Sequence, residues 1–140
     1  MDQLLETKSG KERKEKINLR ILYAEDNQIV RESLKDLLEL RYMVVETVSN
    51  GQELMNKLLT PGISFDCVVT DNNMPFKTGR QVLIEIRANE ELKNLPVVVL
   101  TGDDEIIRKE VESLNAVCIG KPPDFDELFK IIEKSAGVKS

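Results

Sequence analysis

Polar and charged residues stand at the ends of several apolar segments in this sequence of 140 residues. Glu25 and Asp26 close the first apolar segment, and Asp71 closes the most apolar one. Thr101 and Lys121 follow two later segments. If these segments are parallel β-strands, their carboxyl ends lie at one edge of a sheet, where such folds bind ligands. The spacing therefore predicts one pocket that holds three carboxylates, a hydroxyl group and an ammonium group.

Three neighbouring carboxylates indicate a metal site, because they repel one another unless a cation neutralises them. The sequence contains no histidine, and oxygen ligands without histidine or cysteine favour Mg²⁺. Magnesium keeps several coordination positions open and prefers to bind together with phosphate. We therefore expect a phosphoryl group as the transient guest of this pocket.

The positions of the acidic residues indicate how they divide the chemistry. Glu25 and Asp26 are adjacent and can share a metal ion, whereas Asp71 ends the central segment and is the expected nucleophile. An acyl phosphate on Asp71 would need a cation, supplied by Lys121, and a hydroxyl donor, supplied by Thr101. The proline after Lys121 fixes the turn that aims the lysine, and its peptide bond is a candidate for the cis form.

Each of these residues also has an ordinary structural explanation. An Asp-Asn pair after a strand commonly caps a helix, and a Lys-Pro pair commonly forms a turn. Thr101 before Gly102 can simply start the next helix. The chemical interpretation depends on the combination, because five specific residues fall at the ends of successive strands in one chain.

Two periodicities alternate along the chain and define the elements that must position these residues. Short apolar or β-branched segments predict strands at residues 19–24, 43–48, 65–70, 95–100 and 117–119. Apolar residues at helical spacing follow each strand, and Asn27 is the predicted cap of the first helix. Strands without a polar face, each followed by a helix, indicate an α/β fold with a doubly wound parallel sheet of five strands.

Composition and charge limit the other possibilities. The chain has 20 Lys and Arg against 25 Asp and Glu, and its net charge of −5 disfavours direct binding to nucleic acid. No signal peptide or membrane span is visible, and Cys67 and Cys118 lie apart in apolar segments, so we expect a cytoplasmic protein with reduced thiols. We predict a charged tail or linker at residues 1–18, one domain at residues 19–136 and a C-terminal tail at residues 137–140.

The motifs at the strand ends resemble those of the receiver domain of two-component response regulators. They are Leu22-Tyr23-Ala24-Glu25-Asp26-Asn27, Val68-Val69-Thr70-Asp71-Asn72-Asn73-Met74-Pro75 with Gly79 following, Val98-Val99-Leu100-Thr101-Gly102, and Lys121-Pro122. The resemblance covers residues 19–136 and implies a flavodoxin-like sheet of order 2-1-3-4-5. It implies that Asp71 accepts a phosphoryl group from a histidine of a sensor histidine kinase or a histidine phosphotransfer protein. The transfer would then switch a surface that binds a downstream protein.

The same resemblance implies how Mg²⁺ is held as the cofactor. Asp26, Asp71 and the backbone carbonyl of Asn73 would bind the ion directly, and Glu25 would help through a water molecule. A receiver domain is a signalling switch rather than an enzyme, because it catalyses only its own phosphorylation and dephosphorylation.

The resemblance also shows where this chain departs from the family. Thr101 and Lys121 would contact the phosphoryl group, and the family usually places a Tyr or Phe three residues before the lysine, where the ring swings inward as the threonine moves. That position is Cys118 here, so we expect the threonine part of the switch without the aromatic part. The position two residues beyond Thr101, which tunes hydrolysis in the family, is Asp103.

Several alternatives stay open at this point. A phosphatase of the haloacid-dehalogenase type uses similar groups, but it needs a second aspartate where this chain has Asn73. Its acidic pair also comes late in the chain, whereas Glu25 and Asp26 come early. A binding module that has lost the chemistry is a third possibility, against which the complete set of site residues argues. The sequence does not distinguish a stand-alone regulator from a receiver domain of a hybrid sensor histidine kinase.

Overall fold

A parallel sheet of five strands forms the centre of the protein, in the order β2-β1-β3-β4-β5. The computed structural model describes residues 15–102 and 104–138. The strands are β1 (Ile17–Ala24), β2 (Tyr42–Val48), β3 (Cys67–Asp71), β4 (Val97–Thr101) and β5 (Val117–Gly120). The helices are α1 (Gln28–Arg41), α2 (Gly51–Leu58), α3 (Gly79–Ala88), α4 (Glu105–Ser113) and α5 (Phe125–Ser135). This confirms the predicted α/β class and the strand order that the family resemblance implied.

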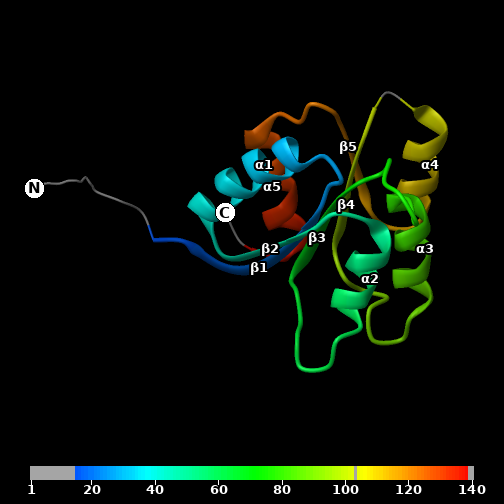
Figure 1. Cartoon of the computed structure of the whole chain (residues 1–140), viewed down its shortest axis with the longest axis horizontal. Helices are drawn as coiled ribbons and strands as arrows, with labels where there is room; N and C mark the ends of the chain where they lie inside the picture. Colours follow the sequence, from blue (N-terminus) through cyan, green and yellow to red (C-terminus); the bar gives the residue numbers. More distant parts are fainter. Residues whose placement is uncertain (1–14, 103, 139–140) are drawn as a thin grey trace, which may run out of the picture.

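Helices cover both faces of the sheet, as Figure 1 shows: α1 and α5 lie on one face, and α2, α3 and α4 lie on the other. Successive residues of a strand enter opposite cores. Leu22 and Val68 belong to the core beneath α2, α3 and α4, whereas their neighbours Tyr23 and Val69 belong to the core beneath α1 and α5. Because both faces are covered, the central strands carry no polar face.

A short polar side chain caps the amino end of each of these helices. The caps are Asn27, Asn50, Thr78, Asp104 and Asp124, and each accepts a hydrogen bond from a backbone N–H in the first turn. Each helix follows a strand, so the caps lie near the carboxyl edge of the sheet. Asn27 was the cap predicted from the sequence, and the structure confirms it.

Four strands begin at other residues than the apolar pattern marks, and β2 differs by one residue, because it begins at Tyr42 instead of Met43. β1 begins at Ile17, two residues before its predicted start, whereas β3 and β4 begin at Cys67 and Val97, two residues after theirs. Pro96 has no N–H to donate to a ladder, although its carbonyl oxygen accepts a hydrogen bond from the N–H of Val68 at 2.9 Å. The limits of a strand follow backbone pairing, so apolar residues beside a strand can remain outside it.

Three residues of the predicted apolar helix faces are exposed, namely Val30, Leu59 and Phe125. Helical spacing groups Val30 with Leu34 and Phe125 with Leu128, yet only the two leucines are buried. Val30 and Phe125 lie in the first turns of α1 and α5, at the carboxyl edge of the sheet. Helical spacing identifies the side of a helix that faces the core, but it does not show where along the helix the sheet ends.

The remaining expectations concern the cysteines, the membrane and the chain ends. Cys67 and Cys118 are both buried free thiols, as predicted, and burial raises the pKa of Cys67 to about 12. In the two described ranges, no helix is long and apolar enough to cross a membrane. Residues 1–14 of the predicted tail, Asp103 and residues 139–140 lie outside the described residues.

Candidate functional site

The ends of two neighbouring strands bring three carboxylates together. Glu25 and Asp26 follow β1, and Asp71 is the last residue of β3, which pairs with β1. One carboxylate oxygen of each residue lies within 4.8 Å of those of the other two. Glu25 and Asp71 are buried, whereas Asp26 is exposed to solvent. The structure thus joins the three acidic residues that the sequence analysis named, and we call them the acidic cluster.

Lys121 reaches the acidic cluster from the end of β5. Its Nζ atom lies 3.3 Å from Oε1 of Glu25 and 3.2 Å from Oδ2 of Asp71. The peptide bond between Lys121 and Pro122 is cis. Burial lowers the pKa of Lys121, but the charges of Asp71 and Glu25 outweigh burial, and the pKa lies above its usual value. Lys121 is therefore a charged ammonium group held between two carboxylates.

The carboxylate of Glu25 is the most enclosed member of the cluster. Burial raises the pKa of Glu25, and Asp71 adds to this rise, while the Asn27 N–H and Lys121 oppose it. The Asn27 N–H donates to Oε2 of Glu25 at 3.1 Å. Nη1 of Arg31 donates to the backbone carbonyl of Glu25 at 2.8 Å. The sequence analysis missed Arg31. Its side chain lies one turn after the helix cap Asn27 and can therefore reach back to the end of β1.

The loop after β3 fixes the position of Asp71. The N–H of Asn73 lies 3.4 Å from Oδ1 of Asp71, and Oδ1 of the buried Asn72 accepts a hydrogen bond from the N–H of Arg80 at 2.9 Å. A Cβ atom at Gly79 would lie 2.7 Å from the carbonyl oxygen of Asp71, so the start of α3 approaches the strand end more closely than a side chain permits. The sequence analysis missed the role of Asn72, because a buried amide that ties a loop has no spacing pattern.

Thr101 lies on the strand next to Asp71. It is buried and ends β4, one position beyond Leu100, the register partner of Asp71. The carbonyl oxygen of Thr101 accepts a hydrogen bond from the N–H of Lys121 at 2.9 Å. The backbones of the two residues predicted to contact a phosphoryl group are therefore directly linked.

Cys118 occupies the position where the family usually has an aromatic ring. Its side chain is buried in the core beneath α2, α3 and α4, and burial raises its pKa. Nη1 of Arg108, from α4, donates to the carbonyl oxygen of Cys118 at 3.0 Å. This hydrogen bond connects α4 to β5 through a side chain that the sequence analysis did not single out.

The donor atoms of the acidic cluster fit a hard divalent cation. All three residues offer carboxylate oxygens, and the exposed Asp26 keeps the cluster open to solvent. Lys121 neutralises only part of their negative charge, and a divalent ion would balance the rest. The residues present therefore agree with the Mg²⁺ site that the sequence analysis expected.

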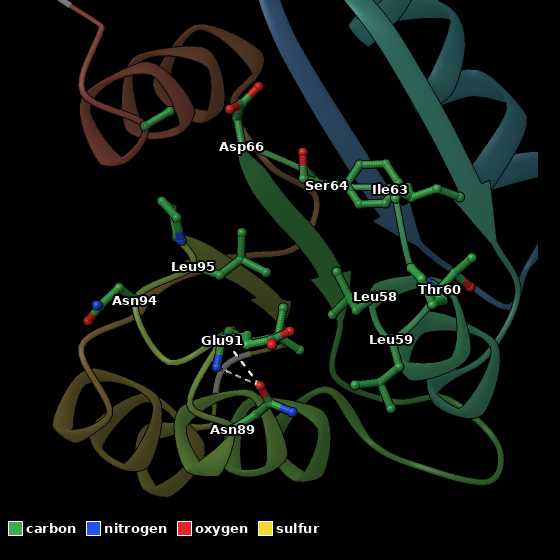
Figure 2. Close-up of a pocket in the computed structure, with 16 residues that line it drawn as sticks. Leu58, Leu59, Thr60, Ile63, Ser64, Asp66, Asn89, Glu91, Asn94 and Leu95 are labelled. Carbon is green, nitrogen blue, oxygen red and sulfur yellow. Dashed lines mark hydrogen bonds between the residues drawn. The ribbon is translucent and has the colours of Figure 1, made fainter.

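A separate hollow of about 810 Å³ lies at the opposite edge of the sheet (Figure 2). The segments before β3 and β4 line it, with apolar side chains such as Leu58 and Leu95. One of its polar side chains serves the local fold: Oδ1 of Asn89 accepts hydrogen bonds from the N–H groups of Glu91 and Leu92 at 2.9 and 3.1 Å. No lysine, arginine or cysteine is among its lining residues. In the part of the chain that the structure describes, the acidic cluster and Lys121 lie at the carboxyl edge, away from this hollow.

The doubly wound sheet, with the acidic cluster and Lys121 at its carboxyl edge, agrees with the receiver class of signalling domains. The family model for the response regulator receiver domain matches residues 21–133. The chain belongs to this family and is a receiver domain of the two-component signalling type.

Individual relatives match most of the chain. It is 34% identical over 120 residues to the chemotaxis protein CheY of Pseudomonas aeruginosa, which covers 83% of this chain and 94% of that protein. It is similar to the crystal structure of the phosphorylated cyanobacterial phytochrome response regulator RcpA, with 30% identity, a TM-score of 0.70 and coverage of 84% and 91% of the two chains. The Mn²⁺-bound form of the response regulator Rcp1 gives 28% identity, a TM-score of 0.68 and coverage of 83% and 90%.

Proposed function

We propose that Asp71 accepts a phosphoryl group from a phosphohistidine on another protein, in a reaction that requires Mg²⁺. The observation that carries the proposal is the setting of Asp71. Its carboxylate lies within 4.8 Å of two further carboxylates and 3.2 Å from the ammonium group of Lys121. A carboxylate that combines a cation site with a fixed positive charge is suited to attack phosphorus and to stabilise the transferred oxygens.

The transfer uses groups of this chain at defined positions. An oxygen of Asp71 forms a bond to phosphorus while the bond between phosphorus and the donor imidazole nitrogen breaks, and that nitrogen leaves with the electron pair and takes up a proton. Lys121 balances charge on the transferred oxygens, and the hydroxyl of Thr101 donates a hydrogen bond to one of them. The chain has no histidine, so the imidazole belongs to a sensor histidine kinase or a histidine phosphotransfer protein.

Asp26, Asp71 and the backbone carbonyl of Asn73 would hold the Mg²⁺ ion, with Glu25 acting through a water molecule. When bound, Mg²⁺ neutralises the carboxylates and the phosphoryl oxygens. Two relatives support this assignment: the structure of Rcp1 is a Mn²⁺-bound form, and the structure of RcpA is a phosphorylated form.

The product would act as a switch for a downstream protein. The phosphoryl group adds negative charge beside Thr101 and Lys121, whose backbones share a hydrogen bond of 2.9 Å at the ends of β4 and β5. A shift of Thr101 is therefore transmitted to β5 and to α4, which Arg108 ties to Cys118. In this role the chain catalyses only its own phosphorylation and dephosphorylation.

Intact-mass measurement after incubation with phosphoramidate and Mg²⁺ tests the proposal. We expect a mass increase of one phosphoryl group that is stable in acid, labile in base and absent when EDTA replaces Mg²⁺. Asp71→Asn should abolish the increase. Asp36→Asn, which removes an exposed carboxylate of α1, should leave it unchanged. An increase that persists in Asp71→Asn would refute the assignment of Asp71.

A further inference from the structure

A short turn between β1 and α1 carries two of the three carboxylates of the acidic cluster. It consists of Glu25, Asp26 and Asn27. On the side of the sheet, the N–H of Glu25 donates a hydrogen bond to the carbonyl oxygen of Val48, the last residue of β2, at 3.1 Å. On the other side the turn leads directly into α1. The positions of the carboxylates of Glu25 and Asp26 therefore depend on what holds this turn to the helix.

Arg31, in α1, contacts the turn at three consecutive carbonyl oxygens. Its Nη1 atom donates a hydrogen bond to the carbonyl oxygen of Glu25 at 2.8 Å and lies 3.4 Å from that of Asp26. Its backbone N–H donates to the carbonyl oxygen of Asn27 at 2.8 Å. Any residue at this position can make the backbone bond, whereas the two side-chain contacts need a donor that is as long as arginine. The half-buried side chain of Arg31 thus joins the turn to the helix.

Asp26 is the member of the acidic cluster that most needs such support. Glu25 and Asp71 lie 3.3 and 3.2 Å from the ammonium group of Lys121. The carboxylate of Asp26 is exposed, and among the described residues no hydrogen bond or ion pair holds it. Because the three carboxylates repel one another, an unsupported Asp26 would turn toward solvent before a cation binds. The contact of Arg31 with the backbone of Asp26 opposes this movement.

The positive charge of Arg31 does not explain its place beside a cation site. A guanidinium group stays charged, and a positive charge near the acidic cluster repels a divalent cation. Nη1 of Arg31 donates instead to neutral carbonyl oxygens of the turn. Loss of the charge alone would strengthen cation binding, whereas loss of support for the turn would weaken it. The two roles of the side chain therefore have opposite effects on cation affinity and can be separated by experiment.

We propose that Arg31 is a positioning residue for the acidic cluster, which holds the turn so that Glu25 and Asp26 meet Asp71 before the cation binds. This inference rests on the cation site of the proposed function and adds a residue that is not itself a ligand of the ion. Residues that orient metal ligands from outside the coordination sphere commonly change metal affinity about ten- to a hundredfold when they are replaced. The support that Arg31 gives should therefore outweigh the repulsion by its charge.

Titration with Mn²⁺ tests the proposal without a phosphoryl donor, because electron paramagnetic resonance measures the free ion directly. Arg31→Gln removes the charge and shortens the side chain, whereas Arg31→Lys keeps the charge and replaces the forked guanidinium by a single ammonium group. The matched control is Lys35→Gln, which removes a positive charge one turn further along α1, where Lys35 pairs with Glu39. Far-UV circular dichroism checks that each variant is folded at the temperature of the titration.

We expect Arg31→Gln to raise the Kd for Mn²⁺ about tenfold and Arg31→Lys to raise it about threefold, because lysine can restore one contact but not both. Lys35→Gln should stay within about twofold of the unchanged chain, since its charge is exposed and screened. Equal or tighter binding by Arg31→Gln would overturn the proposal, as would an equal loss in Lys35→Gln. If Arg31→Gln does not fold, Arg31→Lys decides, and a Kd equal to that of the unchanged chain then overturns the proposal.

The same titration separates this inference from the proposed function. If the unchanged chain binds Mn²⁺ and Arg31→Gln binds it more weakly, but phosphoramidate does not label Asp71, the proposed function fails and the positioning role of Arg31 stands. If the unchanged chain does not bind Mn²⁺, the cation site fails and the positioning role fails with it.

Discussion

Asp26→Asn should make the metal-free protein more stable, because it removes one of three carboxylates that repel one another. The carboxylate oxygens of Glu25, Asp26 and Asp71 lie within 4.8 Å of one another. Lys121 pairs with Glu25 and Asp71, so the substitution of Asp26 removes repulsion and leaves both ion pairs in place. Asp26 is also exposed, and its replacement disturbs no packed core.

The size of the effect follows from the separation and the exposure of the charges. Two unit charges about 4.8 Å apart interact by roughly 1 kcal/mol in water and roughly 3.5 kcal/mol at an effective dielectric constant of about 20. Because Asp26 is exposed and Lys121 already offsets part of the charge of its neighbours, we take the lower limit. Asp26→Asn should therefore raise the free energy of unfolding by about 1 kcal/mol in EDTA.

Mg²⁺ should reverse the order of stability of Asp26→Asn and the unchanged chain. A ligand that binds only the folded chain stabilises it by about 1.4 kcal/mol at a concentration about ten times Kd. The unchanged chain should gain this amount, whereas Asp26→Asn has lost a ligand and should gain little. The difference between the two proteins should therefore vanish or change sign as the Mg²⁺ concentration rises.

Urea unfolding in EDTA and in increasing MgCl₂, followed by circular dichroism, measures these free energies. Asp36→Asn is the matched control, because it removes the same charge from an exposed position of α1 outside the cluster. Its stability should stay within about 0.5 kcal/mol of the unchanged chain in EDTA, and its response to Mg²⁺ should be normal. Repulsion within the cluster is refuted if Asp26→Asn is no more stable than Asp36→Asn in EDTA, and the cation site is refuted if both variants respond equally to Mg²⁺.

Two further predictions concern packing and pH. Gly79→Ala should lower the free energy of unfolding by about 1–3 kcal/mol and weaken Mg²⁺ binding, because its Cβ would lie 2.7 Å from the carbonyl oxygen of Asp71, the last residue of β3. Urea unfolding checks this, with Gly120→Ala as the control, because a Cβ at Gly120 meets nothing within 4 Å. Equal losses of stability in the two variants would contradict the prediction. Hydrogen bonding to Arg41 holds the pKa of Glu133 in the folded chain below its usual 4.5. The ion pair of Arg41 and Glu133 therefore stabilises the folded chain by about 1 kcal/mol above pH 4.5. This contribution is lost as the pH falls through the pKa that Glu133 has in the folded chain. The stability difference between the unchanged chain and Glu133→Gln should therefore shrink as the pH falls below 4.5, and a constant difference in urea unfolding at pH 7 and pH 3 would contradict this.

The sequence was sufficient for those parts of the fold that depend on periodicity. Alternating strand and helix patterns predicted all five strands and all five helices, and their order in the sheet followed from the family motifs. The limits were less certain, because a strand such as β4 begins where backbone pairing begins, at Val97, and not where apolar residues begin, at Leu95. Val30 and Phe125 carry the helical pattern but lie at the sheet edge, a property that depends on how far each helix extends past the strands.

The candidate site also contains residues that the sequence predicts and residues that it does not predict. Glu25, Asp26, Asp71 and Lys121 could be predicted to meet, because parallel strands place their carboxyl ends together, and their distances agree with this. The groups that hold them in place could not be predicted, since the hydrogen bond that the N–H of Arg80 in α3 donates to the side chain of Asn72 depends on the path of a loop. Such contacts join residues whose separation in the sequence matches neither the helical nor the strand periodicity, so no sequence pattern indicates them.

The charges of the site suggest why one transferred group can act as a switch. Three carboxylates and one ammonium group leave the site with an excess of negative charge, which a divalent cation would balance. If Asp71 then accepts a phosphoryl group, the site again gains negative charge, and Lys121 is the cation that an ion pair fixes beside Asp71 among the described residues. Hydrogen-bond donors must then move toward the new phosphoryl oxygens. Thr101 supplies the nearest hydroxyl group on the neighbouring strand β4, and its carbonyl oxygen already accepts a hydrogen bond from the N–H of Lys121. Such a movement would be driven by local charge, and its direction would be set by the same strand ends that assemble the site.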